Sequence, residues 1–75
     1  MATNEKVAKL QDRLGEALKK REIKAIRLSE ITDIPKGAIS YYLKGKSAPK
    51  ADRLKIICEA LDVSEAWMLG YNVPM

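Results

Sequence analysis

Apolar residues recur at helical spacing along most of the chain, and this pattern predicts five helices joined by short loops. The first helix is expected to begin near Glu5, with Thr3 or Asn4 as its cap. Its apolar stripe consists of Val7, Leu10, Leu14, Ala17 and Leu18. It ends in a basic cluster that is either a solvated helix end or a phosphate contact, made of Lys19, Lys20 and Arg21.

The second helix is expected over residues 25–32, with Leu28 as its main apolar anchor. Ile26 and Ile31 do not both share the face of Leu28, so one of them is expected to be partly exposed. A small residue, Ser29, lets the next helix cross closely. The third helix is therefore expected to pack directly against this one.

A tight turn leads into the third helix. Asp33 occupies this turn, where the backbone often needs a residue that tolerates positive φ, and Ile34 points back into the core. Pro35 presets the backbone at the start of the third helix, which begins at Lys36. Gly45 is expected to cap its end.

The fourth helix is expected to run from Lys50 or Ala51 to Leu61, followed by a turn at Asp62 and a core plug at Val63. Its inner face consists of Leu54, Ile57, Cys58 and Leu61. The last, short helix is expected to be capped by Ser64, to run through Leu69 and to end at Gly70, with Trp67 as a core residue. No segment shows strand alternation, so the chain is predicted to be an all-α domain over residues 1–70, with residues 71–75 a tail or the start of a linker.

The third helix is expected to have two different faces. An apolar face that can anchor the helix consists of Ala38, Ile39, Tyr42 and Leu43. A small, polar and basic face without any acid consists of Lys36, Gly37, Ser40, Tyr41 and Lys44. A short helix with this second face is suited to enter a DNA groove.

Composition narrows the classes of function. The 75 residues make one small domain with a net charge of +4, which favours polyanionic partners without proving them. Histidine is absent and Cys58 is the one cysteine, so a zinc site, an internal disulfide and histidine-assisted catalysis are not expected. We expect no cofactor, no metal and no enzyme activity.

No apolar run is long enough for a membrane span, and the N-terminus is no secretory signal, so a cytoplasmic location is expected.

The run from Ile23 to Leu69 resembles the lambda-repressor-like, or Cro/repressor, helix-turn-helix family. The supporting positions are Ile23, Leu28, Ser29, Ile34, Ile39, Ser40, Gly45, Pro49, Leu54, Leu61, Val63, Ser64 and Trp67. The ending SEAWMLGYNVPM is similar to temperate-phage repressors of Gram-positive hosts. The resemblance implies a compact five-helix domain in which the second and third helices form the helix-turn-helix.

The resemblance also implies which residues contact DNA. The third helix would enter the major groove, while the second crosses above it. The base-reading positions would be Lys36, Gly37, Ser40 and Tyr41. The phosphate contacts would come from Lys24, Ala25, Lys44, Lys46, Ser47 and Lys50.

The function implied is sequence-specific binding of double-stranded DNA, as the operator-binding domain of a phage or prophage repressor. Family members bind palindromic half-sites as dimers, so a homodimer is expected. Dimerisation would use either a C-terminal region outside this chain or the surface of Met68, Tyr71, Val73 and Met75, unless these residues pack on their own domain. The alternative function is an antitoxin-type helix-turn-helix protein that also holds a protein partner.

Overall fold

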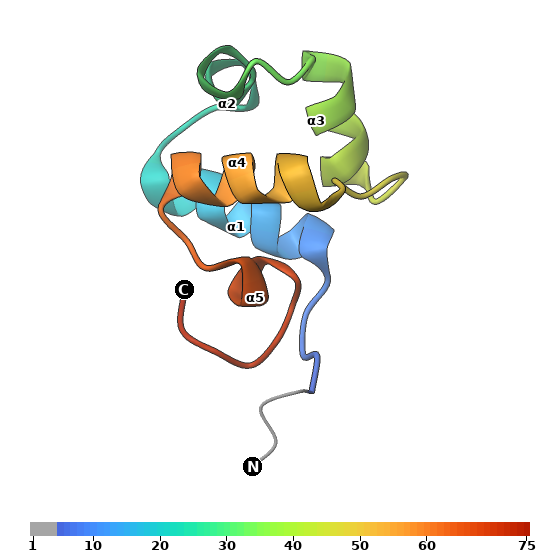
Figure 1. The fold of residues 1–75 in the computed structure, drawn as a ribbon, viewed down its shortest axis with the longest axis vertical. Helices are drawn as coiled ribbons and strands as arrows, with labels where there is room; N and C mark the ends of the chain where they lie inside the picture. Colours follow the sequence, from blue (N-terminus) through green and yellow to red (C-terminus); the bar gives the residue numbers. More distant parts are fainter. Residues whose placement is uncertain (1–4) are drawn as a thin grey trace.

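The computed structural model describes residues 5–75, and this part of the chain folds into five α-helices without a strand (Figure 1). The helices are α1 (Leu10–Arg21), α2 (Ala25–Thr32), α3 (Lys36–Lys44), α4 (Ala51–Leu61) and α5 (Glu65–Met68). The predicted all-α class and the predicted helix-turn-helix of the second and third helices are confirmed. None of these helices is long and apolar enough to cross a membrane.

Helix α1 begins later than predicted. It starts at Leu10 and not near Glu5, and the predicted caps Thr3 and Asn4 lie outside the described residues. The backbone N–H groups of Val7 and Ala8 donate to the carbonyl of Gly70, so they bond across the domain and not within a helix. Val7 is therefore 55% exposed and does not belong to the apolar stripe.

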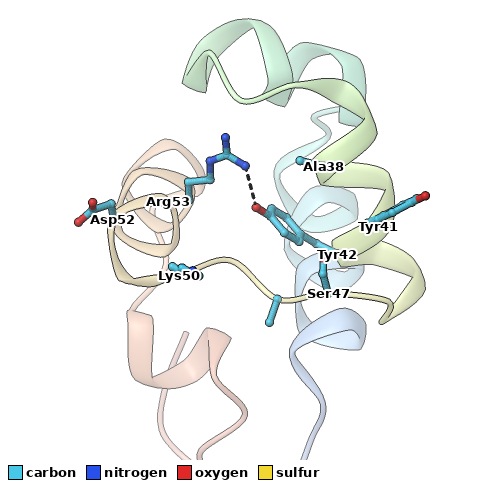
Figure 2. A pocket seen from close by; sticks show the side chains of 8 residues that line it. Ala38, Tyr41, Tyr42, Ser47, Lys50, Asp52 and Arg53 are labelled. Carbon is cyan, nitrogen blue, oxygen red and sulfur yellow. Dashed lines mark hydrogen bonds between the residues drawn. The ribbon is translucent and has the colours of Figure 1, made fainter.

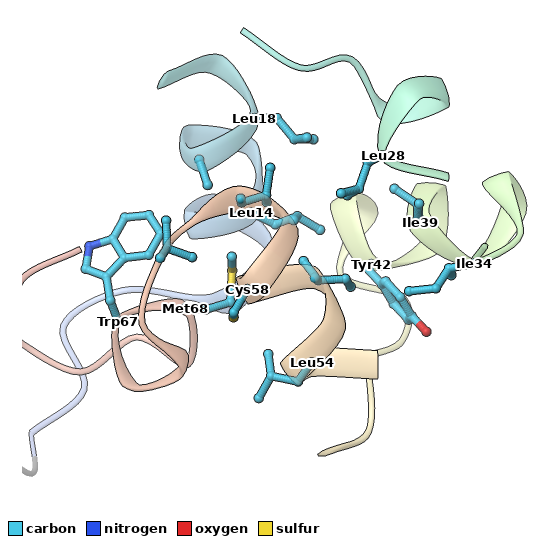
Figure 3. Close-up of a cluster of buried hydrophobic side chains, with 14 residues drawn as sticks. Leu14, Leu18, Leu28, Ile34, Ile39, Tyr42, Leu54, Cys58, Trp67 and Met68 are labelled. Carbon is cyan, nitrogen blue, oxygen red and sulfur yellow. The ribbon is translucent and has the colours of Figure 1, made fainter. Parts of the chain in front are cut away.

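The core takes buried side chains from all five helices, with α2 and α3 at one end of the domain and α5 at the other (Figures 1 and 3). Its fully buried large side chains are Leu14, Leu28, Ile39, Ile57, Leu61 and Met68. The predicted core residues Ile34, Val63 and Trp67 are buried as well. Burial of Met68 removes it from the candidate dimer surface.

Helix α2 is less buried than its composition suggests. Leu28 is fully buried, as predicted, but Ile26 is 52% exposed and Ile31 is 46% exposed. The sequence predicts partial exposure of one of the two, and the structure exposes both. A helix of two turns that packs through one narrow face has room for only one large anchor, and Thr32 occupies the next inward position.

The turn between α2 and α3 is held by side-chain hydrogen bonds. Asp33 adopts the predicted left-handed conformation, with φ 61°. Oγ of Ser29 donates to the carbonyl of Ile34 at 2.6 Å, and Oγ1 of Thr32 accepts from the N–H of Ile34 at 3.3 Å. These bonds fix where α3 begins, and hence the angle at which its exposed face is presented.

The caps of α3, α4 and α5 are the residues that the sequence predicts. Gly45 and Asp62 are left-handed caps of α3 and α4. Ser64 caps α5, because its Oγ accepts from the N–H of Trp67 at 3.0 Å. Helix α5 ends at Met68, one residue before the predicted limit.

Residues 71–75 fold back beneath α5 (Figure 1). Lys6 and Tyr71 form an isolated antiparallel bridge, and the N–H of Ser64 donates to the carbonyl of Met75 at 2.9 Å. Val73 and Met75 are partly buried against the core. These two side chains thus pack on their own domain, which was one of the two alternatives for them.

Candidate nucleic-acid interface

One face of α3 is open to solvent. Its exposed residues are Lys36, Gly37, Tyr41 and Lys44, and Ser40 is partly exposed. The opposite face is closed by Ile39 and Tyr42, which are buried, and by Ala38 and Leu43, which are partly buried. The helix thus has the two faces that its sequence predicts, and a basic and polar surface faces outward.

Two exposed positions on this face are Gly37 and Tyr41. A Cβ added at Gly37 would meet no atom within 4 Å, so packing does not require glycine there. Tyr41 is 53% exposed, and Nζ of Lys46 lies 5.8 Å from the centre of its ring. A cation over the ring restrains the tyrosine and links the face of α3 to the loop that follows it.

The start of α2 offers free backbone donors. Its N-cap is Lys24, which has extended backbone and makes no side-chain capping bond. The amides of the first turn, from Ala25 onward, therefore lack a side-chain acceptor, and an anion would be favoured there by the helix dipole. The nearby ion pair of Arg27 and Glu30, at 3.2 Å, is largely exposed and contributes little to stability.

The end of α3 and the loop that follows it carry the remaining predicted phosphate contacts. Lys44, Lys46, Ser47 and Lys50 are all exposed. Among residues 5–75, the pair of Arg27 and Glu30 is the one ion pair, so none of these lysines is neutralised by a carboxylate of the described chain. Their positive charge is available to an anionic partner.

A hollow of about 460 Å³ lies between α3 and the start of α4 (Figure 2). It is lined by Ala38, Tyr41, Tyr42, Ser47, Ala48, Lys50, Asp52 and Arg53. Nη1 of Arg53 donates to Oη of Tyr42 at 3.1 Å. Arg53 is not predictable as a site residue from the sequence, because its spacing from the other basic residues matches no pattern until α4 is placed beside α3.

One residue of the basic cluster at the end of α1 has a structural role. Nε of Arg21 donates to the carbonyl of Leu61 at 2.7 Å, and its Nη2 donates to the carbonyl of Asp62 at 2.8 Å. Arg21 therefore satisfies carbonyl groups at the end of α4. This role is neither of the two alternatives for the cluster, which were a solvated helix end and a phosphate contact. Lys19 and Lys20 remain exposed.

Among residues 5–75, neither a candidate metal-ligand cluster nor an exposed thiol is found. No group of three or more potential metal ligands occurs among them. Cys58 is buried in the core, and its burial, with a smaller effect from the charge of Glu65, raises the pKa of its thiol to about 11. The thiol is therefore protonated at neutral pH and unsuited to act as a nucleophile.

Comparisons with known proteins agree with this geometry. The chain is similar to the solved structure of the P22 c2 repressor protein in complex with synthetic operator 9T in the presence of Tl⁺. The TM-score is 0.78 and the identity 22%, over 84% of this chain and 96% of that one, so the two share a fold. A search of curated proteins found no match. A helix-turn-helix family model matches residues 14–68, which is most of the chain. The chain therefore belongs to the lambda-repressor-like helix-turn-helix family of DNA-binding domains and is not an enzyme.

Proposed function

We propose that this protein binds double-stranded DNA sequence-specifically, as the operator-binding domain of a phage or prophage repressor. The observation that carries the proposal is the exposed face of α3, which is basic, free of acids and fixed in angle by the bonded turn. The P22 c2 repressor protein, which has the same fold, was crystallised in complex with a synthetic operator. That likeness supports the proposal that this domain also acts on an operator.

In this proposal α3 enters the major groove with Lys36 and Tyr41 toward the base edges. The ammonium group of Lys36 can donate to O6 or N7 of guanine. The ring of Tyr41 can pack on a thymine methyl group. Ser40 lies beside them, and Gly37 lets the backbone of α3 approach the bases closely.

Phosphate contacts flank the reading face on two sides. On one side are Lys24 and the open amides of the first turn of α2, which begins at Ala25. On the other side are Lys44, Lys46, Ser47 and Lys50, in and beside the loop that leaves α3. Contacts on both strands that border the groove would hold α3 in one register.

The protein would act as a homodimer on two half-sites about one helical turn apart. A single domain covers few base pairs, so pairing is needed for regulatory affinity. The burial of Met68 and the packing of Val73 and Met75 on their own domain favour dimerisation outside this surface.

A selection from random duplexes, followed by gel shifts at two salt concentrations, tests the proposal. We expect one sequence family to be enriched, with palindromic half-sites, and its duplex to bind more tightly than a random duplex. No enrichment, together with recovery of a tight protein partner in a pull-down, would instead indicate an antitoxin-type protein.

A further inference from the structure

The hollow between α3 and α4 contains an arginine that is bonded to a neutral group. Within residues 5–75, the side-chain partner of Arg53 is the hydroxyl of Tyr42, and no carboxylate forms an ion pair with the guanidinium. Asp52 also lines the hollow, but Figure 2 shows its carboxylate pointing away from Arg53. The positive charge of Arg53 is thus held in place without being neutralised.

The hydroxyl that holds Arg53 has a fixed position. The ring of Tyr42 is buried on the inward face of α3, so its Oη cannot move without disturbing the core (Figures 2 and 3). An exposed arginine normally loses considerable rotamer freedom when it binds a partner. Here the bond to Tyr42 removes part of that freedom in advance, and the other N–H groups of the guanidinium are left to donate.

The rest of the hollow suits a phosphate. Ser47 offers a hydroxyl and Lys50 a second positive charge, and both line the same hollow as Arg53. Tyr41, on the exposed face of α3, also lines the hollow. A planar guanidinium can bind two phosphate oxygens side by side, which gives direction as well as affinity.

We propose that Arg53 contacts one phosphodiester of the bound DNA and that Tyr42 is its positioning residue. This inference rests on the proposed function and adds a contact to it. Since Tyr42 belongs to α3, the contact ties the position of the reading helix directly to one phosphate. The register of α3 in the groove then depends on a hydrogen bond inside the protein.

The test compares Arg53→Gln, Tyr42→Phe and the double variant with the unchanged chain. The probes are the duplex selected by this protein and a random duplex of equal length, each titrated over a range of salt concentrations. Lys55→Gln is the matched control, because Lys55 is exposed on α4 but lies about 200° around the helix from Arg53. Thermal melts confirm that each variant is folded at the assay temperature.

We expect Arg53→Gln to weaken binding to both duplexes and to make the slope of log K against log salt shallower by about 0.9 per domain. Tyr42→Phe keeps the charge, so its slope should stay unchanged, while affinity falls roughly threefold to tenfold. In the Arg53→Gln background, Tyr42→Phe should cause no further loss. Lys55→Gln should keep the slope of the unchanged chain.

The inference is overturned if Arg53→Gln keeps the original slope and affinity, or if Tyr42→Phe weakens binding equally in both backgrounds. Its failure can be separated from failure of the proposed function. Equal binding of selected and random duplexes by the unchanged chain would contradict sequence specificity, whereas the slope on random DNA would still decide the contact by Arg53. A chain that binds neither duplex contradicts both.

Discussion

At the scale of single residues, some basic side chains are bonded within the fold, whereas others are exposed and have no ion-pair partner in the described chain. Arg21 is bonded to the end of α4, and Nη1 of Arg13 donates to the carbonyl of Trp67 at 2.8 Å. Lys36 and Lys50 have no ion-pair partner within the described chain. Basic residues that look alike in the sequence therefore have different roles, and the structure is needed to tell these roles apart.

Cys58 gives a prediction at this scale. Its pKa of about 11 lies above the ordinary value of 9.0, so the folded state favours the neutral thiol. The folded chain should react with a thiol reagent at neutral pH only as fast as it unfolds. The stability that the neutral thiol contributes is fully present below about pH 9 and is lost as the pH rises toward about 11.

Labelling kinetics with and without denaturant measure this, and Cys58→Ser is the unlabelled control. The difference in stability between the unchanged chain and Cys58→Ala should be constant below pH 9, and above it the unchanged chain should lose stability relative to the variant. Rapid labelling of the folded chain would show that the thiol is accessible and would contradict its burial.

At the scale of helices, the structure shows which positions require glycine and which do not. Gly15 lies inside α1, and a Cβ there would sit 4.0 Å from Cδ2 of Leu43, an ordinary contact. Gly15→Ala should therefore stabilise the fold by up to about 1 kcal/mol, the usual difference in helix propensity. The added methyl group would also fill part of an apolar hollow lined by Leu18 and Ile23.

Gly70 is the contrasting position. Its φ is +106°, and a Cβ there would collide with the backbone carbonyl of Ala8. Gly70→Ala should destabilise the domain by more than about 1 kcal/mol, since both the backbone and the bonds to Val7 and Ala8 must shift. Urea unfolding of the two variants measures both effects. A loss of stability in Gly15→Ala, or none in Gly70→Ala, would contradict the geometry around these residues.

Helix pattern and turn chemistry made most of this fold predictable. The bounds of α2, the left-handed Asp33 and the capping of α5 by Ser64 follow from local rules that operate within a few residues. The start of α1 does not, because the bridge of Lys6 to Tyr71 joins segments at opposite ends of the chain. Long-range backbone pairing leaves no periodic signal in the sequence.

The candidate site was predictable to the same extent. The outward face of α3 follows from the helical period, which places Lys36 and Tyr41 together. The contact between Tyr42 and Arg53 depends on how α3 and α4 cross, so spacing alone does not reveal it. In the same way, the cation of Lys46 over the ring of Tyr41 depends on the path of the loop.

At the scale of the whole molecule, the end of the domain that we propose binds DNA lies opposite the end where the two terminal segments pair. Helices α2 and α3 lie at one end, while α5 and residues 71–75 lie at the other (Figure 1). If each domain neutralises about four phosphates, log K should fall against log salt with a slope near −3.6 per domain. Titrations at several salt concentrations measure this slope. A slope near zero would show that the exposed lysines do not contact phosphates.

The central claim is that Lys36 reads bases while the lysines of the loop hold phosphates. The most direct measurement is the ratio of affinities for the selected duplex and a random duplex, for Lys36→Ala and Lys50→Ala. Lys50 is the better loop position for this, because Lys46 lies over the ring of Tyr41 and its loss would also free that ring. We predict that Lys36→Ala lowers the ratio by roughly tenfold, as expected for a lost base contact, while Lys50→Ala weakens both duplexes equally and leaves the ratio unchanged. Equal ratios in the two variants would contradict the account.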